Sequence, residues 1–571
     1  RRVSPPQTVN HPTTEKARKV HKVLPDTMTR ARLALALAPR RASPPRTPRR
    51  HRAYRASSDD AVPAPPRVGD VVRVECASVT TTGEGVCRMP DGRVFLCRGA
   101  TPGERVEATV TSVTKNLARG TTTRTIERSP RAVEPRCPHH GTCGGCAWQR
   151  LAYDAQATLK RDIVADAMRR VGKVRDANAL VDKCEGAVET YGYRNRMEFA
   201  FATSTRDGER VDVGLRPRGS NAEVVDLSAG CAIQSDEANA ALMAVRETLR
   251  RLGGEVEAFD RTSGKGTLRS VTIRTATSSD GKRSVMVNLQ TTAEDGELTE
   301  GPVAELVREV SKVDAVSSVV HTSVPNEAEL RRAGGGRTSK FVKGRKANAK
   351  SKKKVVALYG DDVLVESLDG LQFELSSASF FQTNTKQAET LVRRVRDACG
   401  FSGNKTEIVL DLFCGAGTLG LSVASEASRV MGWEVVPEAV EDAKRNAEIN
   451  GIVNADFYRV NLAKLNASKG AQGLLKTADG RTLPMPDIVI TDPARPGMDA
   501  ALIDILRKIG AKRIVYVSCN PSTQARDLLA LTSSSTGPGD TAYELKSCTP
   551  VDMFPHTPHV ESIAVLDATK M

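Results

Sequence analysis

The chain is predicted to be a multidomain α/β protein with a doubly wound, Rossmann-like domain at its C-terminal end. Strand-like and helix-like segments alternate over residues 376–571, which is typical of a parallel sheet with helices on both faces. Three polar motifs in that region each follow an apolar run, and doubly wound enzymes place ligands at such strand ends. The 571 residues leave room for further domains before residue 376.

Two further domains are expected in the N-terminal half. Residues 62–128 alternate as strands do, with glycine turns, and predict a small OB-like barrel that either binds RNA or is a plain barrel. Residues 136–375 mix a helical segment with antiparallel strand patterns and predict an α+β middle domain. Inside it, residues 331–354 hold eleven Lys and Arg and no acid. This composition predicts a disordered basic insertion, which either neutralises phosphates or is a solvated surface loop.

Most of the net charge of +16 comes from the N-terminal segment. Residues 1–58 hold 15 Lys and Arg against Glu15 and Asp26, so they contribute +13. From Met28 to Ser58 there are nine arginines and no acid, which favours an organelle transit peptide over a basic RNA-binding tail. Frequent Ser and Pro favour a plastid (chloroplast) over a mitochondrion. No apolar run reaches the roughly 18 residues of a membrane helix, so we expect a soluble protein.

The expected C-terminal strands are short, apolar and separated by helical stretches such as Glu438–Ile449 and Leu502–Ile509. These strands are Ile408–Leu412, Val430–Trp433, Asp487–Thr491, Ile514–Ser518 and Ser562–Leu566.

A cofactor site is predicted where the first two of these strands end. The run Asp411–Gly420 is a strand end, a Gly-rich turn and a helix start, and glycines such as Gly415 allow a ligand to approach the backbone. The next strand ends in Glu434, whose carboxylate can accept both hydroxyls of a ribose. The alternative is an acid at a helix start, before Pro437. Asn461 follows a further short strand and is a candidate contact. The set matches S-adenosylmethionine enzymes better than nicotinamide enzymes.

Cys519 is predicted to be a nucleophile, although a buried cysteine is more often structural. It follows the apolar strand Ile514–Ser518, so the thiol is delivered at a strand end. Beside an S-adenosylmethionine site, such a thiol suggests a methyltransferase that attacks a pyrimidine base covalently. Carbon 5 of uracil is too weak a nucleophile to take a methyl group from a sulfonium unaided. A thiolate that adds to carbon 6 creates an enolate, and a base must then remove the proton on carbon 5. Glu561 is the candidate base, and Arg495 or Arg526 could favour the thiolate.

Taken together, these motifs resemble the RNA uracil-5 methyltransferase family, in the branch with a TRAM domain and an iron–sulfur cluster. The resemblance covers roughly residues 66–571 and implies that Cys519 is the nucleophile and Glu561 the base. The matching runs are Phe380–Asn384, Asp411–Gly415, Asp492–Arg495, Ser518–Pro521 and Phe554–Glu561. The implied lining of the cofactor and base pocket is Gln382, Phe413, Glu434, Asn461 and Asp492. The basic insertion, the stretch Ala463–Pro486 and Thr418 depart from the family pattern and leave the fit of the substrate open.

A cluster of cysteines predicts a metal centre. Three of them, in Cys-x5-Cys-x2-Cys spacing, are Cys137, Cys143 and Cys146. Cys231 and Cys184 compete for the place of the fourth ligand. The spacing suits zinc or a [4Fe–4S] cluster, and His139 and His140 leave a Cys3His zinc site open. The resemblance implies a [4Fe–4S] cluster with Cys231 as the fourth ligand. Because the methyl transfer needs no electron, the cluster is expected to be structural or to position RNA.

We therefore expect a monomeric enzyme that forms 5-methyluridine in structured RNA, with ribosomal RNA favoured over transfer RNA. Cytosine-5 methylation uses similar thiol chemistry, but a Pro-Cys loop would favour it, and here the proline follows Asn520. Amino-group methylation is disfavoured because the run Asp492–Arg495 lacks an aromatic residue to stack on adenine. A non-catalytic RNA-binding assembly factor is the alternative of another class. It would be expected to have lost Cys519, Glu434 or Glu561.

Overall fold

The computed structural model of the chain describes residues 66–569, apart from 90, 205–207, 209, 218–222, 261–262, 293–297, 325–353, 466–474, 477–479 and 534–539. The expected transit peptide at 1–58 lies outside the described residues. So does the basic insertion at 331–354, except for Lys354. None of the helices in the described ranges combines the length and the apolarity that a membrane crossing requires.

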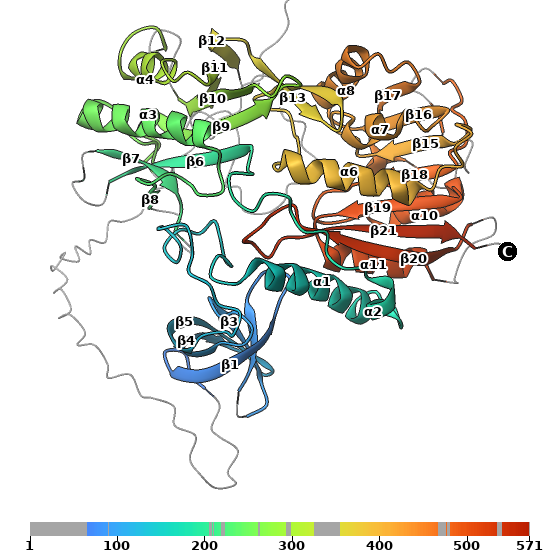
Figure 1. The fold of residues 1–571 in the computed structure, drawn as a ribbon, viewed down its shortest axis with the longest axis horizontal. Coiled ribbons are helices and arrows are strands. Elements are labelled where there is room, and N and C mark those ends of the chain that lie inside the picture. Colours follow the sequence, from blue (N-terminus) through green and yellow to red (C-terminus); the bar gives the residue numbers. More distant parts are fainter. Residues whose placement is uncertain are drawn as a thin grey trace, which may run out of the picture. The chain divides into compact units, whose positions relative to one another are not determined.

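The first described domain is a closed five-stranded barrel in the order β1-β2-β3-β5-β4, which confirms the predicted barrel (Figure 1). Successive side chains of a strand point to opposite sides, so every second residue of β1 faces the barrel core, as Val72, Val74 and Cys76 do. The strands are β1 Val71–Val79, β2 Gly85–Arg88, β3 Val94–Arg98, β4 Arg105–Val113 and β5 Leu117–Glu127.

The middle domain is built on a seven-stranded sheet in the order β12-β11-β10-β9-β6-β7-β8, in which only the β10–β11 pair is parallel among the described strands. Helices α3 and α4 pack on it through apolar faces. Its strands are β6 Arg196–Thr203, β7 Val211–Leu215, β8 Val225–Asp226, β9 Leu268–Thr277, β10 Arg283–Thr291, β11 Val316–Ser323 and β12 Val355–Gly360. Its helices are α3 Asp236–Leu252, η1 Gly253–Glu255 and α4 Pro302–Val310.

The C-terminal sheet has the order β17-β16-β15-β18-β19-β21-β20 (Figure 1). Its first five strands are parallel, which confirms the doubly wound prediction, whereas β21 runs antiparallel to both β19 and β20. The strands are β15 Ile408–Leu412, β16 Arg429–Glu434, β17 Ala455–Arg459, β18 Ile488–Thr491, β19 Arg513–Ser518, β20 Tyr543–Val551 and β21 Glu561–Ala568. The helices are α6 Thr385–Cys399, α7 Thr418–Val423, α8 Pro437–Ile449, η3 Leu462–Lys464, α10 Ala500–Ile509 and α11 Pro521–Leu531.

Apolar cores cover both faces of this sheet. Leu410 and Leu412 of β15 belong to one core, with α10 and α11, while Val409 belongs to the other, with α6, α7 and α8. The first core also takes in Ile163 and Met168 of helix α1 (Tyr153–Arg170), which short helix α2 (Ala177–Leu180) follows. The hairpin of β13 (Val363–Leu368) and β14 (Leu371–Ser376) contributes to the second core.

Helix α1 and the β13–β14 hairpin contribute to the cores of the C-terminal sheet although they precede its strands in sequence. The sequence pattern places both within the middle domain at 136–375, because they precede the strand–helix alternation. Helix α1 packs with the C-terminal sheet, more than 200 residues further along the chain. The hairpin packs on both domains: Leu368, Phe373 and Leu375 belong to the core of the C-terminal sheet, whereas Leu364 packs with Ala276, Met286 and Val320 of the middle sheet. The C-terminal domain is completed by segments that come before it in sequence.

Candidate active site

Cys519 lies in the turn between strand β19 and helix α11, as the sequence predicts. The strand is a continuous buried run, which is typical of the interior of a parallel sheet. Asn520 caps the helix: its side-chain oxygen accepts a hydrogen bond from the N–H of Ser522 at 3.2 Å. Pro521 stands at the helix start, where a missing N–H costs no hydrogen bond. The thiol is partly buried and lines a cavity of about 1170 Å³.

Glu561 and Asp492 line the same cavity. Glu561 is the first residue of β21, and because β21 is antiparallel to β19, it lies beside the end of β19 that carries Cys519. Asp492 follows β18, the parallel neighbour of β19. Burial raises the pKa of both carboxyls; the charge of Asp492 raises that of Glu561 further, and Arg495 opposes the rise. The pair therefore holds a proton more readily than an exposed carboxylate does.

The thiol of Cys519 is neutral in the resting protein. Burial raises its pKa to about 11, the charges of Glu561 and Asp492 add to the rise, and Arg495 opposes it. Arg495 thus supplies the expected positive charge that lowers the thiol pKa, but burial and the two carboxylates outweigh it. Arg526 instead donates hydrogen bonds to two carbonyl oxygens of the loop before α10, at 2.9 and 3.0 Å. A thiol in this state must lose its proton before it can act as a nucleophile.

The turn after β15 has the backbone of a ligand-binding turn. Phe413 has a φ of 61°, a left-handed conformation that a bulky residue rarely adopts. Glu434 accepts hydrogen bonds from the N–H of Gly415 at 3.2 Å and from those of Val435 and Val436 at 2.7 and 2.9 Å. These three contacts fix the carboxylate, as the alternative of a helix-start acid also requires. Two carboxylate oxygens have about four acceptor sites, so capacity remains for a ribose hydroxyl.

The structure brings together all but one of the residues expected to bind the cofactor. Five of them line the cavity: Gln382, Phe413, Gly415, Glu434 and Asp492. Asn461 is exposed at the start of η3 and is not part of this lining. It follows β17, the edge strand of the sheet, whereas the other strand-end residues follow interior strands. A cofactor contact by Asn461 stays a prediction from the resemblance.

The four cysteines of the expected metal centre line this cavity too. The pKa of Cys231 is raised to about 12, first by burial and then by the charges of Cys146, Cys143 and Cys137. The four sulfur atoms are therefore close enough to repel one another as thiolates. A soft cation would remove this repulsion, because thiolate is the preferred ligand of iron–sulfur clusters and a common ligand of zinc.

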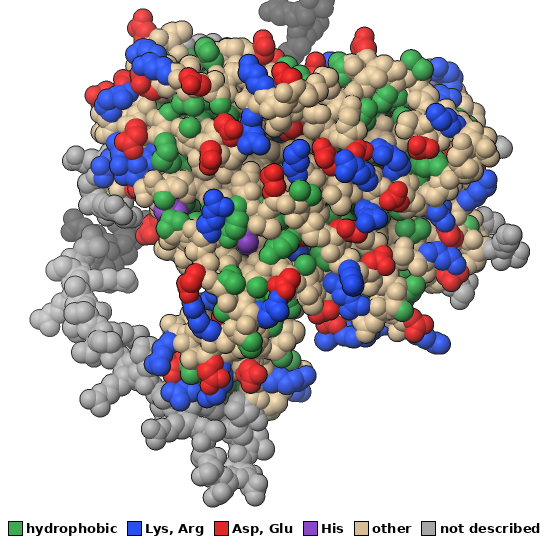
Figure 2. All heavy atoms as spheres, viewed as in Figure 1, with side chains coloured by type: hydrophobic (Ala, Val, Ile, Leu, Met, Phe, Trp, Pro, Cys, Tyr) green, Lys and Arg blue, Asp and Glu red, His purple; other side chains and the backbone are tan. Residues whose placement is uncertain are grey.

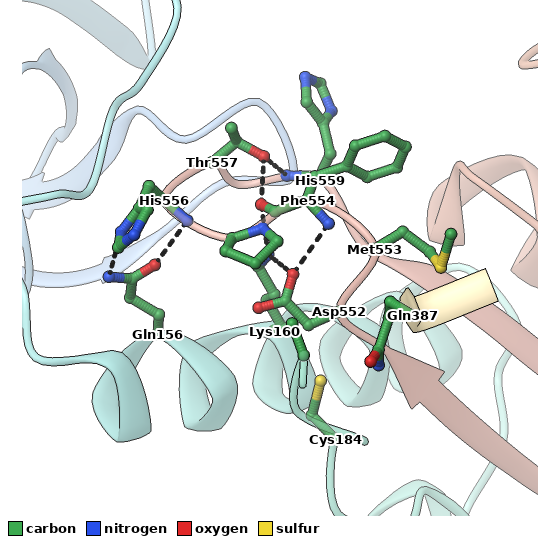
Figure 3. A network of polar contacts seen from close by, with 12 residues as sticks. Gln156, Lys160, Cys184, Gln387, Asp552, Met553, Phe554, His556, Thr557 and His559 are labelled. Atoms are coloured by element: carbon green, nitrogen blue, oxygen red, sulfur yellow. Dashed lines mark hydrogen bonds and ion pairs between the residues drawn. The ribbon is translucent and has the colours of Figure 1, made fainter. Parts of the chain in front are cut away.

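Cys184 lies elsewhere, beside Lys160 and Asp552 (Figure 3). Across the described ranges, no three His, Cys, Asp or Glu side chains are already arranged as ligands of one ion. The four thiols have the chemistry of metal ligands and line one cavity, and both the metal centre and its metal stay predictions.

Arg194 and His559 also line the cavity, although the sequence analysis does not single them out. Burial lowers the pKa of His559, and the charges of Arg495, Lys160 and Arg194 lower it further, so the imidazole is neutral. The available signal was proximity in sequence, because His559 lies two residues before Glu561. No pattern in the sequence marks Arg194. It precedes β6 of the middle sheet and lines the same cavity as Cys519 and Glu561 of the C-terminal sheet.

Comparisons with known proteins agree with this geometry. The family model described as tRNA (uracil-5-)-methyltransferase matches residues 345–569, and that of the TRAM domain matches residues 65–123. An uncharacterized RNA methyltransferase of Halalkalibacterium halodurans is 33% identical over 88% of this chain and 98% of its own length. One of Nitratidesulfovibrio vulgaris is 32% identical over 87% and 96%.

A solved structure shares the fold. It is the tRNA (uracil-54, C5)-methyltransferase of Pyrococcus abyssi in complex with S-adenosyl-L-homocysteine, with a TM-score of 0.60, 24% identity, and coverage of 86% of this chain and 100% of that one. The full-length relatives and the two family models establish kinship. The chain belongs to the RNA (uracil-5-)-methyltransferase family of S-adenosylmethionine-dependent enzymes.

Proposed function

We propose that this enzyme methylates carbon 5 of a specific uridine in structured RNA through a covalent adduct with Cys519. One observation carries the proposal: a thiol and a buried carboxyl, Cys519 and Glu561, stand at adjoining strand ends on one cavity. The same cavity is lined by the Gly-rich turn and by Glu434. A nucleophile, a base and a donor site are the three parts that this chemistry needs.

The reaction assigns one role to each group. The sulfur of Cys519 forms a bond to carbon 6 of uracil, which makes carbon 5 nucleophilic. The thiol proton passes to Asp492, the carboxylate whose charge, together with that of Glu561, raises the pKa of Cys519. Carbon 5 then takes the methyl group, and Glu561 removes the proton from carbon 5. The carbon–sulfur bond breaks, and the thiolate recovers its proton.

The donor side of the cavity is assigned to Phe413, Gly415 and Glu434. S-adenosylmethionine supplies an electrophilic methyl group on a positively charged sulfur. Glu434, already fixed by three backbone N–H groups, accepts one ribose hydroxyl. Gln382 has an amide that can pair with the polar edge of a base, and it lines the same cavity.

We also propose that Cys137, Cys143, Cys146 and Cys231 hold a [4Fe–4S] cluster. Four thiols that converge on one cavity support this, and zinc is the alternative. The chemistry on uracil moves electron pairs only, so the cluster's role is to shape the protein or to place the RNA.

Ribosomal RNA is the substrate class we favour, with transfer RNA as the alternative. The branch with a TRAM domain and a cysteine cluster, which the sequence resembles, is the basis for this choice. Cytosine-5 methylation stays second because Pro521 follows rather than precedes the Cys519–Asn520 pair. A non-catalytic assembly factor would not need the reactive groups that line this cavity.

Mapping of modified uridines by mass spectrometry tests the proposal. Plastid and mitochondrial ribosomal and transfer RNAs are compared with and without the protein, and a single 5-methyluridine should depend on it. The Cys519→Ala variant should bind S-adenosylmethionine and form no product, while the intact enzyme should form a denaturant-stable adduct with 5-fluorouridine RNA. Methylation by Cys519→Ala at the wild-type level would remove the thiol from the mechanism.

A further inference from the structure

The loop of residues 552–560 connects β20 to β21 and delivers Glu561 to the cavity. It has no helix or strand of its own, and its polar groups bond largely to side chains and backbone from before the methyltransferase sheet (Figure 3). A loop that carries a base must be held by something, because an ångström of misplacement weakens proton transfer.

A buried ion pair anchors the start of this loop. Lys160 of α1 and Asp552 are both fully buried and directly bonded. The Lys160 ammonium also donates to the carbonyl oxygen of Phe554 at 2.9 Å, and the hydroxyl of Tyr153 donates to Asp552 at 2.9 Å. A buried ion pair is weak evidence for stability, since well-packed apolar residues often serve as well. Lys160 and Tyr153 together make three directed contacts to this one loop, two to Asp552 and one to Phe554, which suggests that they position it.

The middle of the loop is held at His556. Its φ is 67°, a strained conformation that surrounding contacts must enforce. Gln156 of α1 accepts a hydrogen bond from the His556 N–H at 2.9 Å. The N–H groups of Ala147 and Trp148 both donate to the His556 carbonyl oxygen at 2.9 Å. The buried hydroxyl of Tyr193 donates to the carbonyl oxygen of the preceding residue, Pro555, at 3.1 Å.

These contacts also join the cysteine cluster to the catalytic base. Ala147 directly follows Cys146, and His556 lies five residues before Glu561. The ring of His556 packs on Tyr191, with 4.3 Å between ring centres. One short loop therefore touches α1, the end of the cysteine segment and the strand that begins with Glu561.

We propose that Tyr193, Gln156 and Lys160 are positioning residues that hold Glu561 where it can take the proton from carbon 5. This inference rests on the proposed function. It follows that their loss slows release of the methylated RNA from Cys519, while donor binding and methyl transfer keep their rates. None of the three needs to touch a substrate for this effect.

The test separates the two steps in single turnovers. The RNA is an unmodified transcript that carries the uridine identified by the mapping experiment. Radioactive methyl in the RNA reports transfer, and protein–RNA adduct on denaturing gels reports release. Tyr193→Phe should transfer methyl at the wild-type rate and lengthen the adduct lifetime by roughly 3- to 10-fold, as the loss of one hydrogen bond predicts. Gln156→Met also removes the donors to the carbonyl oxygens of Trp148 and Leu151, so it should lengthen the adduct lifetime at least as much without slowing transfer.

The matched control is Tyr543→Phe, which also removes a buried tyrosine hydroxyl that donates to a carbonyl, that of Leu506. Tyr543 pairs with Ala568, at the end of β21 opposite to Glu561, so its adduct lifetime should be unchanged. Replacing both Lys160 and Asp552, by Met and Leu, avoids a lone buried charge and should prolong the adduct at least as much. Hydrogen exchange of residues 552–560 should rise in each positioning variant and not in the control.

Wild-type adduct lifetimes in both Tyr193→Phe and Gln156→Met would overturn the inference. If transfer and release slow equally, and Tyr543→Phe slows both as well, the contacts contribute only to general stability. That result would also overturn the inference. If the wild-type enzyme forms neither adduct nor product, the proposed function fails, and that result is read from the wild type alone.

Discussion

The ionisation of Cys519 gives a sharp prediction about the resting enzyme. With a pKa of about 11, the thiol is ionised in about 0.03% of molecules at pH 7.5, against about 10% for an ordinary cysteine of pKa about 8.5. A thiolate of higher pKa is the stronger nucleophile, by about tenfold over this difference. Cys519 should therefore react with a small thiosulfonate reagent roughly 20- to 30-fold more slowly than a free cysteine.

The assay is timed reaction with methyl methanethiosulfonate, quenched in acid and read by mass spectrometry of the peptide that contains Cys519. Deprotonation increases with pH, so the rate should rise from pH 6.5 to 9 without levelling off, by less than tenfold per unit where Asp492 and Glu561 ionise and raise the thiol pKa. Fully buried Cys548 should stay unmodified wherever the fold is intact. A plateau of the rate below pH 8 would refute the reasoning, because it would place the thiol pKa within the measured range.

Charge variants should shift the pKa of the Cys519 thiol, and with it the rate of modification, in opposite directions. Glu561→Gln removes a carboxyl whose charge raises the thiol pKa, so modification of Cys519 should become faster above about pH 8, where this carboxyl is ionised. Arg495→Gln removes the opposing positive charge, so it should become slower. Lys546→Gln, an exposed residue paired with Glu544, is the control and should change nothing. Bound S-adenosylmethionine, which is cationic, should speed the reaction relative to bound S-adenosylhomocysteine, which shields the site equally but lacks the charge.

Three further predictions follow from the site. Glu561→Gln should still transfer methyl but leave the RNA attached to Cys519, and free methylated RNA at the wild-type rate would exclude it as the base. Anaerobically purified protein should contain about four irons per chain, and Cys143→Ser or Cys231→Ser should bleach it while Cys184→Ser should not; zinc without iron would favour the alternative. Deletion of residues 331–354 should flatten the salt dependence of RNA binding by about 0.7 to 0.9 in slope for each phosphate that the segment neutralises, without changing the modified uridine. An unchanged slope would make this segment a solvated insertion.

The sequence predicts the interior of the C-terminal sheet well, because parallel strands buried on both faces read as continuous apolar runs. The expected Ile408–Leu412 is observed without change, and Ile514–Ser518 differs only at its first residue. Strand β20 is not predicted. It alternates Tyr, Glu, Leu and Lys and then contains Pro550, which argues against a strand. It is an edge strand, where both features are tolerated.

The shared position of Cys519 and Glu561 is predictable because each residue ends or begins a strand, whereas the support around them is not. Lys160 and Gln156 sit on a helix at positions that an amphipathic pattern assigns to the buried face, yet both are polar. Their partners lie about 400 residues away in sequence, at Asp552 and His556. A sequence pattern shows which residue types share a helix face. It does not show which distant loop their side chains bind.

The charges of the cavity bear on how RNA reaches it. Arg194 and Arg495 are the arginines in its described lining, against six carboxyl residues: Glu198, Glu434, Glu438, Asp442, Asp492 and Glu561. Such a cavity attracts a cationic sulfonium and repels phosphate, although protonation of the buried carboxyls moderates the effect. Uracil is neutral and can enter alone.

The RNA backbone must therefore be held outside, and the target base must leave its stack to reach Cys519, at a cost of a few kcal/mol. On the face shown in Figure 2, Lys and Arg are interspersed with Asp and Glu rather than gathered in one patch. Many weak phosphate contacts fit such a surface better than one strong site, and phosphate contacts alone carry no sequence information. The choice of uridine then depends on which base in the folded RNA can leave its stack within reach of Cys519. An isolated single strand is spared the unstacking cost but lacks the folded arrangement of phosphates, so lower activity on it than on the structured RNA would show that the phosphate contacts outweigh that cost.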